Sequence, residues 1–302
     1  MTSPSSPSPV DRLALAVVTE PERALGAVMA APAGAREDAM RHLLQTAAEG
    51  GVGLVATRPD GDGERLLGQA WPFPSPFRVS VRTVSVSEGV DRVEARARRS
   101  LERLGLPRGD VLLVSNAADL AGSEGRALWD RLNALKDRGL FRRIGLCAEI
   151  DDGPVVLARR LQPDVIQLQC NLLDQRAVND GIIAALAAQG CAVHASSIFA
   201  GGVLFADSEG LPPALTGHAL ALSRTRRRLA EARLDPMQAA LAFALGLEGV
   251  DAVVASVASA AELRAILAAA HAPAPALDWT TLGLEAPAAF AADARRRISS
   301  AA

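Results

Sequence analysis

The fold is decided in the middle of the chain by DVIQLQC (residues 164–170), a helical pattern over residues 176–189, and CAVHAS (residues 191–196). Both short runs are mostly apolar, which is typical of strands buried on both faces of a parallel sheet. Parallel neighbours need a crossover connection, and a helix is the usual one. This stretch therefore predicts a strand–helix–strand unit of an α/β fold.

The same order repeats on both sides of this unit. Further candidate strands lie at residues 12–18, 53–57, 77–83, 110–115, 142–147 and 251–256. Helical patterns follow at residues 36–51, 64–70, 90–104, 127–138, 155–161 and 260–270, with two more at 219–234 and 237–247. Eight strand–helix units over about 250 residues favour a closed (β/α)8 TIM barrel. An open doubly wound sheet would also favour a G-x-G-x-x-G motif after its first strand, and the sequence has none there.

Domain organisation follows from the same pattern. We expect residues 1–10, rich in Ser and Pro, to be a disordered tail and residues 11–302 to form a single barrel domain. A last helical pattern at residues 287–298 predicts an extra C-terminal helix. The sequence shows no run of about 18 apolar residues and no secretory signal, and its three cysteines lack metal-ligand spacing. These features indicate a cytoplasmic protein without a membrane span.

The charge pattern argues against nucleic acid as a partner. The net charge is −2 and the isoelectric point is near 6.1, whereas nucleic-acid binding usually needs a basic stripe. Two arginine sets are interleaved with glutamates on predicted helices, which indicates solvated faces: Arg96, Arg98 and Arg99, and Arg224, Arg226, Arg227 and Arg228. We expect a small-molecule ligand instead, and the sequence leaves the oligomeric state open.

Two absences in the composition exclude several chemistries. The chain has no tyrosine, and Lys136 is its one lysine. No phenol can therefore donate a proton, and a Schiff-base or phosphate-loop lysine could only be Lys136, which no G-x-x-x-x-G-K-[ST] motif surrounds. Codon bias would explain the missing lysines, but it does not say what replaces them at a site.

Barrels of this kind carry their chemistry at the C-terminal ends of the strands. Those positions hold mainly hydroxyl, amide and small side chains, and they offer neither a carboxylate pair nor a histidine cluster for a metal. For His194 a buried, hydrogen-bonded imidazole is favoured over a catalytic base, and for Cys147 and Cys170 small buried hydrophobes are favoured over reactive thiols. The candidate pocket comprises Arg58, Asn116, Cys147 and Asn171.

Two loops after the last strands could bind an anion. In SSIFAGGVL (residues 196–204), Gly201 and Gly202 would let backbone amides approach a phosphate. In SVASAAEL (residues 256–263), Ser259 and Glu262 are spaced as a capping box at the start of a helix. The alternative is that the glycines only turn the chain and the box only caps the helix, and both interpretations stay open.

Several short stretches match a known family in order and spacing: GERLLGQA, RRSLERLGLPRGDVLLV, LKDRGLFRRIGL, DVIQLQCNLLDQR, VHASSIFAGGVL, and DPMQAALAFAL followed by VDAVVASVASAAEL. From about Leu13 to about Leu267 the chain resembles the aldo-keto reductases, NAD(P)H-dependent carbonyl reductases built on this barrel. The resemblance implies a catalytic tetrad of Asp, Tyr, Lys and His. Here Ala56, Arg82 and Ser115 stand at the Asp, Lys and His positions. The tyrosine position falls in the stretch A-T-R-P-D-G-D-G-E (residues 56–64), which is one residue shorter there than the family's motif.

The resemblance also implies a nicotinamide cofactor. Gln167 matches the glutamine that holds the nicotinamide amide, and Ser197, Gly201 and Gly202 match the pyrophosphate loop. Ala258 stands where family members commonly have a side chain that contacts the cofactor's phosphate. The sequence therefore does not decide between NAD and NADP as the cofactor. Asp174 and Arg176 of the N-L-L-D-x-R stretch, which starts at Asn171, are expected to brace their loop. The expected cofactor-binding residues are Gln167, Ser196, Ser197, Gly201, Gly202, Ser256 (in place of a typical glycine), Ser259 and Glu262.

Three hypotheses follow. The first is a pseudoenzyme that binds a nucleotide or small metabolite, because loss of acid catalysis alone typically costs about 10²–10⁴-fold. The second is an active NAD(P)H-dependent oxidoreductase in which Arg82 polarises the carbonyl and water supplies the proton. The third is a structural partner subunit whose pocket is filled by Arg58 and Arg82.

Overall fold

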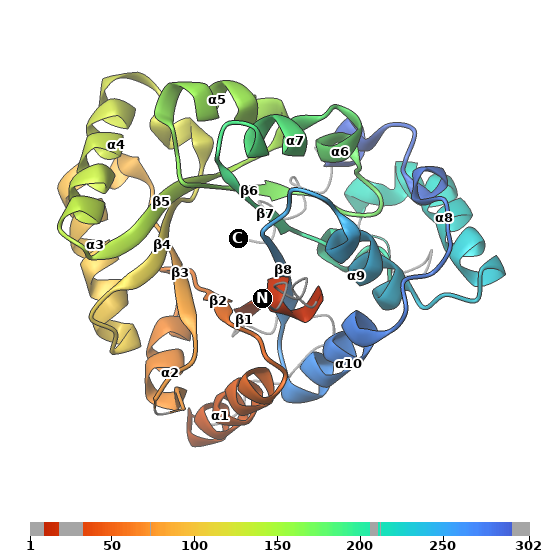
Figure 1. The fold of residues 1–302 in the computed structure, drawn as a ribbon, viewed down its shortest axis with the longest axis horizontal. Coiled ribbons are helices and arrows are strands. Elements are labelled where there is room, and N and C mark those ends of the chain that lie inside the picture. The colour runs from red at the N-terminus through yellow and green to blue at the C-terminus, as the bar shows by residue number, and fades with distance from the viewer. Residues whose placement is uncertain (1–8, 18–32, 73, 206–210, 212, 292–302) are drawn as a thin grey trace, which may run out of the picture.

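The structure is a computed structural model that describes residues 9–17, 33–72, 74–205, 211 and 213–291. Within these residues, eight parallel strands form a closed barrel in which each pairs with its neighbour in sequence and β8 pairs with β1 (Figure 1). The strands are β1 (Leu13–Val17), β2 (Leu54–Ala56), β3 (Arg78–Arg82), β4 (Gly109–Val114), β5 (Phe141–Ala148), β6 (Val165–Gln169), β7 (Ala192–Ser196) and β8 (Ala252–Val257). The predicted TIM barrel is confirmed, and each strand lies within one residue of its expected ends.

A ring of helices surrounds the barrel (Figure 1). The helices are α1 (Ala33–Glu49), α2 (Gly63–Ala70), α3 (Val90–Leu104), α4 (Gly122–Asp137), α5 (Pro154–Leu161), α6 (Arg176–Asn179), α7 (Ile182–Ala187), α8 (Ala219–Glu231), α9 (Pro236–Gly246) and α10 (Ala260–His271). The single helix expected at residues 176–189 is divided into α6 and α7, because Gly181 adopts the left-handed conformation with φ of 68°. None of the helices in the described residues is long and apolar enough to cross a bilayer.

The two ends of the described chain both pack against the barrel. A 3-10 helix, η1 (Pro9–Arg12), precedes β1 and buries Val10, so the last two residues of the expected tail are structured, while residues 1–8 lie outside the described residues. Residues 287–291 are helical, as expected for the start of the C-terminal helix, and the rest of that helix lies outside the described residues. Phe290 is fully buried and meets the His218 ring edge-on at 5.5 Å.

Alternation along the strands divides the core into two regions. Side chains on the outer face, such as Val79 and Val81 of β3, belong to the large cluster that packs against the helices. Inner-face residues form separate lumen clusters, one around Val111, Leu113 and Val165 and another around Ala14, Leu54, Ala252 and Val254. The strand residues that alternate with those of the outer cluster therefore point into the lumen, which places the site residues described below.

An ion cluster lies at the N-terminal end of the barrel. The buried carboxylate of Asp110 accepts a hydrogen bond from Arg143 Nη2 at 2.7 Å, and Arg78 Nη1 lies 3.8 Å from the same oxygen. Arg78 and Arg143 are inner-face residues of β3 and β5, next to the apolar layer. Each arginine at this end of the lumen thus has a carboxylate partner.

A glutamate-centred network joins α3 to α4. Glu94 accepts hydrogen bonds from Arg98 on its own helix, from Arg131 on α4 and from Arg138, which caps the end of α4. The donor–acceptor distances are 2.7–3.0 Å. Partial burial by itself raises the pKa of Glu94, but the hydrogen bonds from Arg131, Arg98 and Arg138 outweigh it and hold the pKa at about 2. Arg96 differs from the expected solvated face, since it reaches the buried carboxylate of Glu64 on α2 at 3.2 Å.

Replacing Glu94 by glutamine tests this network. The folded-state pKa of about 2 lies below the usual 4.5, so the carboxylate stabilises the fold above about pH 4.5 and this contribution disappears as the pH falls towards 2. We expect Glu94→Gln to lower the free energy of unfolding by about 1–2 kcal/mol at pH 7, because the arginines are partly exposed and screened. Urea unfolding of both proteins at pH 7, 5 and 3 should show the difference shrinking with acidity, and a constant difference would contradict this explanation.

Candidate functional site

The mouth of the barrel is the end where the strands finish, and it brings the three substituted tetrad positions together. Ala56 ends β2, Arg82 ends β3 and Ser115 follows β4, so the three lie on consecutive strands at one end of the lumen. Ala56 pairs in register with Ser80 of β3 and presents only a methyl group there. The site therefore combines one cation with small side chains.

The Ser115 hydroxyl is engaged with the backbone. Its Oγ donates a hydrogen bond to the Thr83 carbonyl, and its own N–H donates to Thr83 Oγ1 at 3.2 Å. These two bonds hold the end of β3 against the end of β4. The hydroxyl proton of Ser115 is consequently directed at the main chain, and Ser115 would have to break this bond to donate to a ligand.

The single lysine cannot take part at the mouth. Lys136 lies on α4, outside the barrel, and its Nζ is 2.6 Å from both carboxylate oxygens of Asp164. Asp164 Oδ2 also accepts from the Ile144 N–H at 2.8 Å, so the pair fastens α4 to the start of β6. The ion pair between Lys136 and Asp164 therefore has a structural role.

Two of the four candidate pocket residues shape turns. Asn116 Oδ1 accepts from the Ala118 N–H at 3.0 Å and caps a short 3-10 helix after β4. Asn171 is buried, and its Oδ1 accepts from the N–H groups of Leu173 and Asp174, each at 3.0 Å. Its Nδ2 is buried without a hydrogen-bond partner in the described structure. Both side chains therefore stabilise turns that follow strands, while Arg58 is exposed and Cys147 is partly buried.

The pKa of the Cys147 thiol reflects the charges around the mouth. Burial raises the pKa of its thiol, the positive charges of Arg82 and Arg58 oppose that rise, and the charge of Glu149 adds to it. Burial likewise raises the pKa of Cys170 to about 12. The raised pKa values favour the protonated form of both thiols at neutral pH. Cys170 is buried as expected, whereas Cys147 is only partly buried.

His194 lies inside the barrel beside Gln167. The two residues pair in register on β7 and β6, and Cys147 of β5 pairs with Gln167, which makes a row across the inner face. Burial, followed by the charge of Arg143, lowers the pKa of His194 to about 4, so the imidazole is neutral at pH 7. It is buried as predicted, but the expected hydrogen bond to the ring is not found among the described residues.

The loop after β7 is held mainly by its own backbone. Ser197 and Ala200 have positive φ angles of 55° and 50°, and Gly201 and Gly202 have 63° and 87°. The N–H groups of Ala200, Gly202 and Val203 donate to carbonyls within the loop at 2.8–3.3 Å. Ser196 Oγ donates to the Leu168 carbonyl at 3.0 Å. These amides are thus already committed to a compact turn.

The predicted cap of α10 forms. Ser259 Oγ accepts from the Glu262 N–H at 3.2 Å, and Glu262 Oε2 accepts from the N–H of Ala258, one residue before the cap, at 2.8 Å. Ser256 is exposed on β8. A carboxylate therefore lies at the start of the helix, where it competes with any bound anion for the positive end of the helix dipole.

The loop after β6 is braced by side chains that bond back to the chain. Arg176 donates a bidentate pair of hydrogen bonds to the Asp174 carboxylate at 2.8 and 2.9 Å, as expected. It also donates a hydrogen bond to Asp151 at 3.0 Å. Gln175 has a role that the sequence did not indicate, since its Nε2 donates to the carbonyls of Leu172 and Trp279. This pair of bonds ties the loop to the segment that follows α10, and no local pattern signals it.

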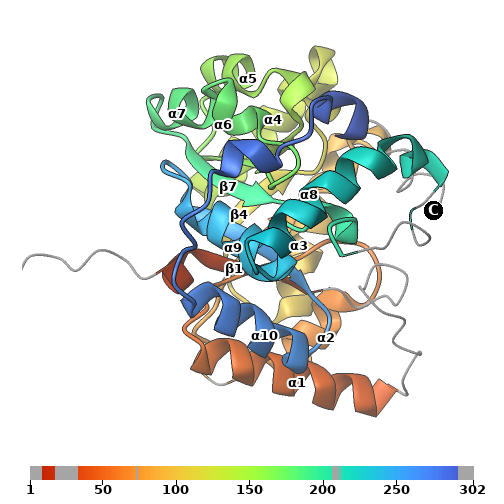
Figure 2. The same ribbon diagram turned by 90° about the vertical axis from the view of Figure 1, so that its right-hand side faces the viewer.

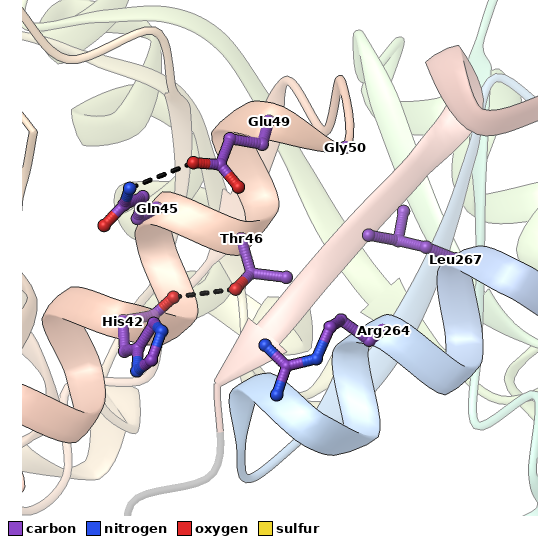
Figure 3. Close-up of a pocket in the computed structure, with 7 residues that line it drawn as sticks. All are labelled: His42, Gln45, Thr46, Glu49, Gly50, Arg264 and Leu267. Carbon is purple, nitrogen blue, oxygen red and sulfur yellow. Dashed lines mark hydrogen bonds between the residues drawn. The ribbon is translucent and has the colours of Figure 1, made fainter.

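Two surface grooves lie outside the barrel mouth. One, of about 310 Å³, runs between α1 and α10 and is lined by polar residues such as His42, Glu49 and Arg264 (Figure 3). Figure 2 shows these two helices side by side. The other, of about 400 Å³, surrounds Asp164 and Cys191 at the N-terminal end of the barrel. No group of three or more His, Cys, Asp or Glu residues suited to a metal occurs within the described ranges.

The comparisons with known proteins agree with the fold and the order of the motifs. The model of the aldo/keto reductase family matches residues 75–283, which is more than half of the chain. The chain therefore belongs to the aldo/keto reductase family, whose members generally bind NAD(P)H. No match is found among the curated proteins compared with it.

Solved structures show the same architecture at low sequence identity. An aldo-keto reductase of Bacillus halodurans in its holo form is 17% identical, with a TM-score of 0.66, 93% of this chain and 91% of that chain covered. A putative aldo-keto reductase of Pseudomonas aeruginosa is 20% identical, with a TM-score of 0.61 and coverages of 86% and 89%. An aldose reductase of Giardia lamblia is 13% identical, with a TM-score of 0.64 and coverages of 92% and 90%.

Proposed function

We propose that this chain is a pseudoenzyme of the aldo/keto reductase family, a binding or accessory protein that holds a small metabolite or nicotinamide nucleotide at the barrel mouth. The observation that carries the proposal is the lack of a proton donor: the chain has no tyrosine. Ser115 directs its hydroxyl at the Thr83 carbonyl, and the guanidinium of Arg82 practically never gives up a proton. Carbonyl reduction needs such a donor as the oxygen becomes negative.

A nicotinamide cofactor fits one end of the site better than the other. The Gln167 side chain is buried on the inner face of β6, and its amide can pair with the nicotinamide amide. At the phosphate end, the N–H groups of Ala200, Gly202 and Val203 are engaged within the 196–204 loop, and Glu262 adds a negative charge. When bound, the cofactor supplies a hydride. We expect weak binding without a preference for NADP, because Ala258 offers no charge to a 2′-phosphate.

Cofactor titration and a single-turnover assay test the proposal. We expect NADPH and NADH fluorescence to change only at high micromolar concentrations. Oxidation of the bound cofactor by aldehydes should be at least about 10²-fold slower than in a family member with an intact tetrad, measured alongside. A rate comparable with that control would refute the pseudoenzyme. Failure to bind either cofactor would remove both cofactor-dependent functions and leave a metabolite-binding or structural role.

A second candidate function is an oxidoreductase with a rebuilt site. It is favoured by Arg82, a cation at the mouth that could polarise a carbonyl oxygen. Hydride would add to the carbonyl carbon, the C=O electron pair would move to the oxygen, and water would supply the proton and leave hydroxide. Rapid cofactor oxidation in the native protein that is lost in Arg82→Ala would support this function over the pseudoenzyme.

A further inference from the structure

Arg82 differs from the other arginines of the lumen. It is a partly buried inner-face residue at the mouth end of β3, since Val79 and Val81 of the same strand pack outward. Arg78 and Arg143, at the opposite end, share the carboxylate of Asp110. Among the described residues, no carboxylate or carbonyl group accepts a hydrogen bond from Arg82 or forms an ion pair with it. Within the described part of the chain, a partly desolvated cation therefore has no counter-ion.

A buried polar group two residues from Arg82 on β3 also lacks a partner in the described structure. Ser80 is 2% exposed and its Oγ makes no hydrogen bond in the described structure. It lies on the same face of β3, and its neighbour in register, Ala56, can offer it none. Gln167, on the inner face of β6, is 3% exposed. Buried polar groups are normally satisfied, so each unpaired group needs an explanation.

Cys147 links these groups to one part of the lumen. It pairs in register with Gln167, and the charge of Arg82 acts on its thiol. Arg82 on β3 and Gln167 on β6 thus lie on either side of Cys147 on β5, all three on the inner face of the barrel. An oxygen-rich ligand placed between them could accept from the guanidinium and the amide together, with the Ser80 hydroxyl below.

We propose that the mouth binds the carboxylate of a small monoanionic metabolite, with Arg82 as its counter-ion and Gln167 and Ser80 as further donors. A planar guanidinium matches the two oxygens of a carboxylate. The Arg82 guanidinium neutralises one negative charge, and the nearby Glu149 charge disfavours a phosphate dianion. The inference rests on the proposed binding role of the mouth, but it does not require a nicotinamide cofactor.

Calorimetric titration with pyruvate, acetate and inorganic phosphate tests the assignment. We expect pyruvate and acetate to bind the full-length protein, and Arg82→Gln to raise both Kd values at least tenfold, with Arg82→Lys in between. Arg99→Gln, which removes an exposed arginine of α3 that pairs with Glu102, is the matched control and should leave binding unchanged. Phosphate binding more tightly than pyruvate, or equal carboxylate affinity in Arg82→Gln, would overturn the proposal.

Two further measurements keep the test independent of folding and of the cofactor. Because Arg82 has no partner to lose among the described residues and an unpaired desolvated charge is unfavourable, Arg82→Gln should unfold at the same temperature as the native protein or a higher one. Pyruvate should slow alkylation of Cys147, followed by peptide mass spectrometry, and this protection should vanish in Arg82→Gln. Carboxylate binding without NADPH binding would remove only the cofactor part of the proposed function. The reverse result, NADPH binding without carboxylate binding, would overturn this inference alone.

Discussion

Asp110→Ala is expected to lower the free energy of unfolding by about 3 kcal/mol. The Asp110 side chain is 5% exposed and accepts a 2.7 Å hydrogen bond from Arg143, which is itself one-quarter exposed, with Arg78 close by. Removing the carboxylate leaves a largely buried cation without its partner, a change that typically costs about 3–5 kcal/mol, and the partial exposure of Arg143 favours the lower end. Urea unfolding followed by circular dichroism measures the difference.

Asp91→Ala is the matched control for this prediction. Asp91 pairs with Arg131 at a similar distance, 2.8 Å, but its side chain is 92% exposed. Water solvates both charges there, so we expect no measurable change in stability. Equal losses in the two variants would show that burial does not decide the energetics of the Asp110 cluster.

Gly68→Ala is expected to destabilise the protein by about 2–3 kcal/mol, although alanine is the better helix former. Gly68 lies in α2, and a Cβ there would stand 2.1 Å from the Arg103 carbonyl oxygen and 3.0 Å from the Leu104 Cα of α3. Helix propensity favours alanine by about 1 kcal/mol. The clash involves backbone atoms, which cannot turn aside, so overpacking outweighs this gain. Thermal and urea unfolding measure the net change.

Gly246→Ala provides the comparison within the same fold. Gly246 is the last residue of α9, and a Cβ there would meet nothing within 4 Å. Propensity acts alone at this position, and we expect the variant to be as stable as the native protein or slightly more so. A stable Gly68→Ala protein would mean that α2 and α3 can separate without cost.

The sequence predicted the elements well because their signals are local. Apolar runs such as residues 164–170 and 191–196 each report their own strand, and the repeated order of strands and helices implied the barrel. The capping box at Ser259 was likewise visible, since its partners lie three residues apart. The error at residues 176–189 arose from one residue, Gly181, whose left-handed conformation ends a helical pattern that the side chains continue.

The partners of the polar side chains could not be predicted in the same way. Asp110 meets Arg143 across 33 positions of sequence, and Gln175 meets Trp279 across 104. The sequence placed Ser115 and Arg82 at the mouth, but their difference appears only in the structure. Ser115 is bonded to Thr83, whereas Arg82 has no partner among the described residues.

By itself, the sequence determined the barrel, the family resemblance and the absence of a tyrosine proton donor, because these depend on residue type and on spacing along the chain. The tertiary structure alone decided which charges are neutralised, because closing the barrel brings distant strands together and excludes water from between them. Asp110 thereby neutralises Arg78 and Arg143 at one end of the lumen, whereas Arg82, at the other, has no counter-ion among the residues that the structure describes.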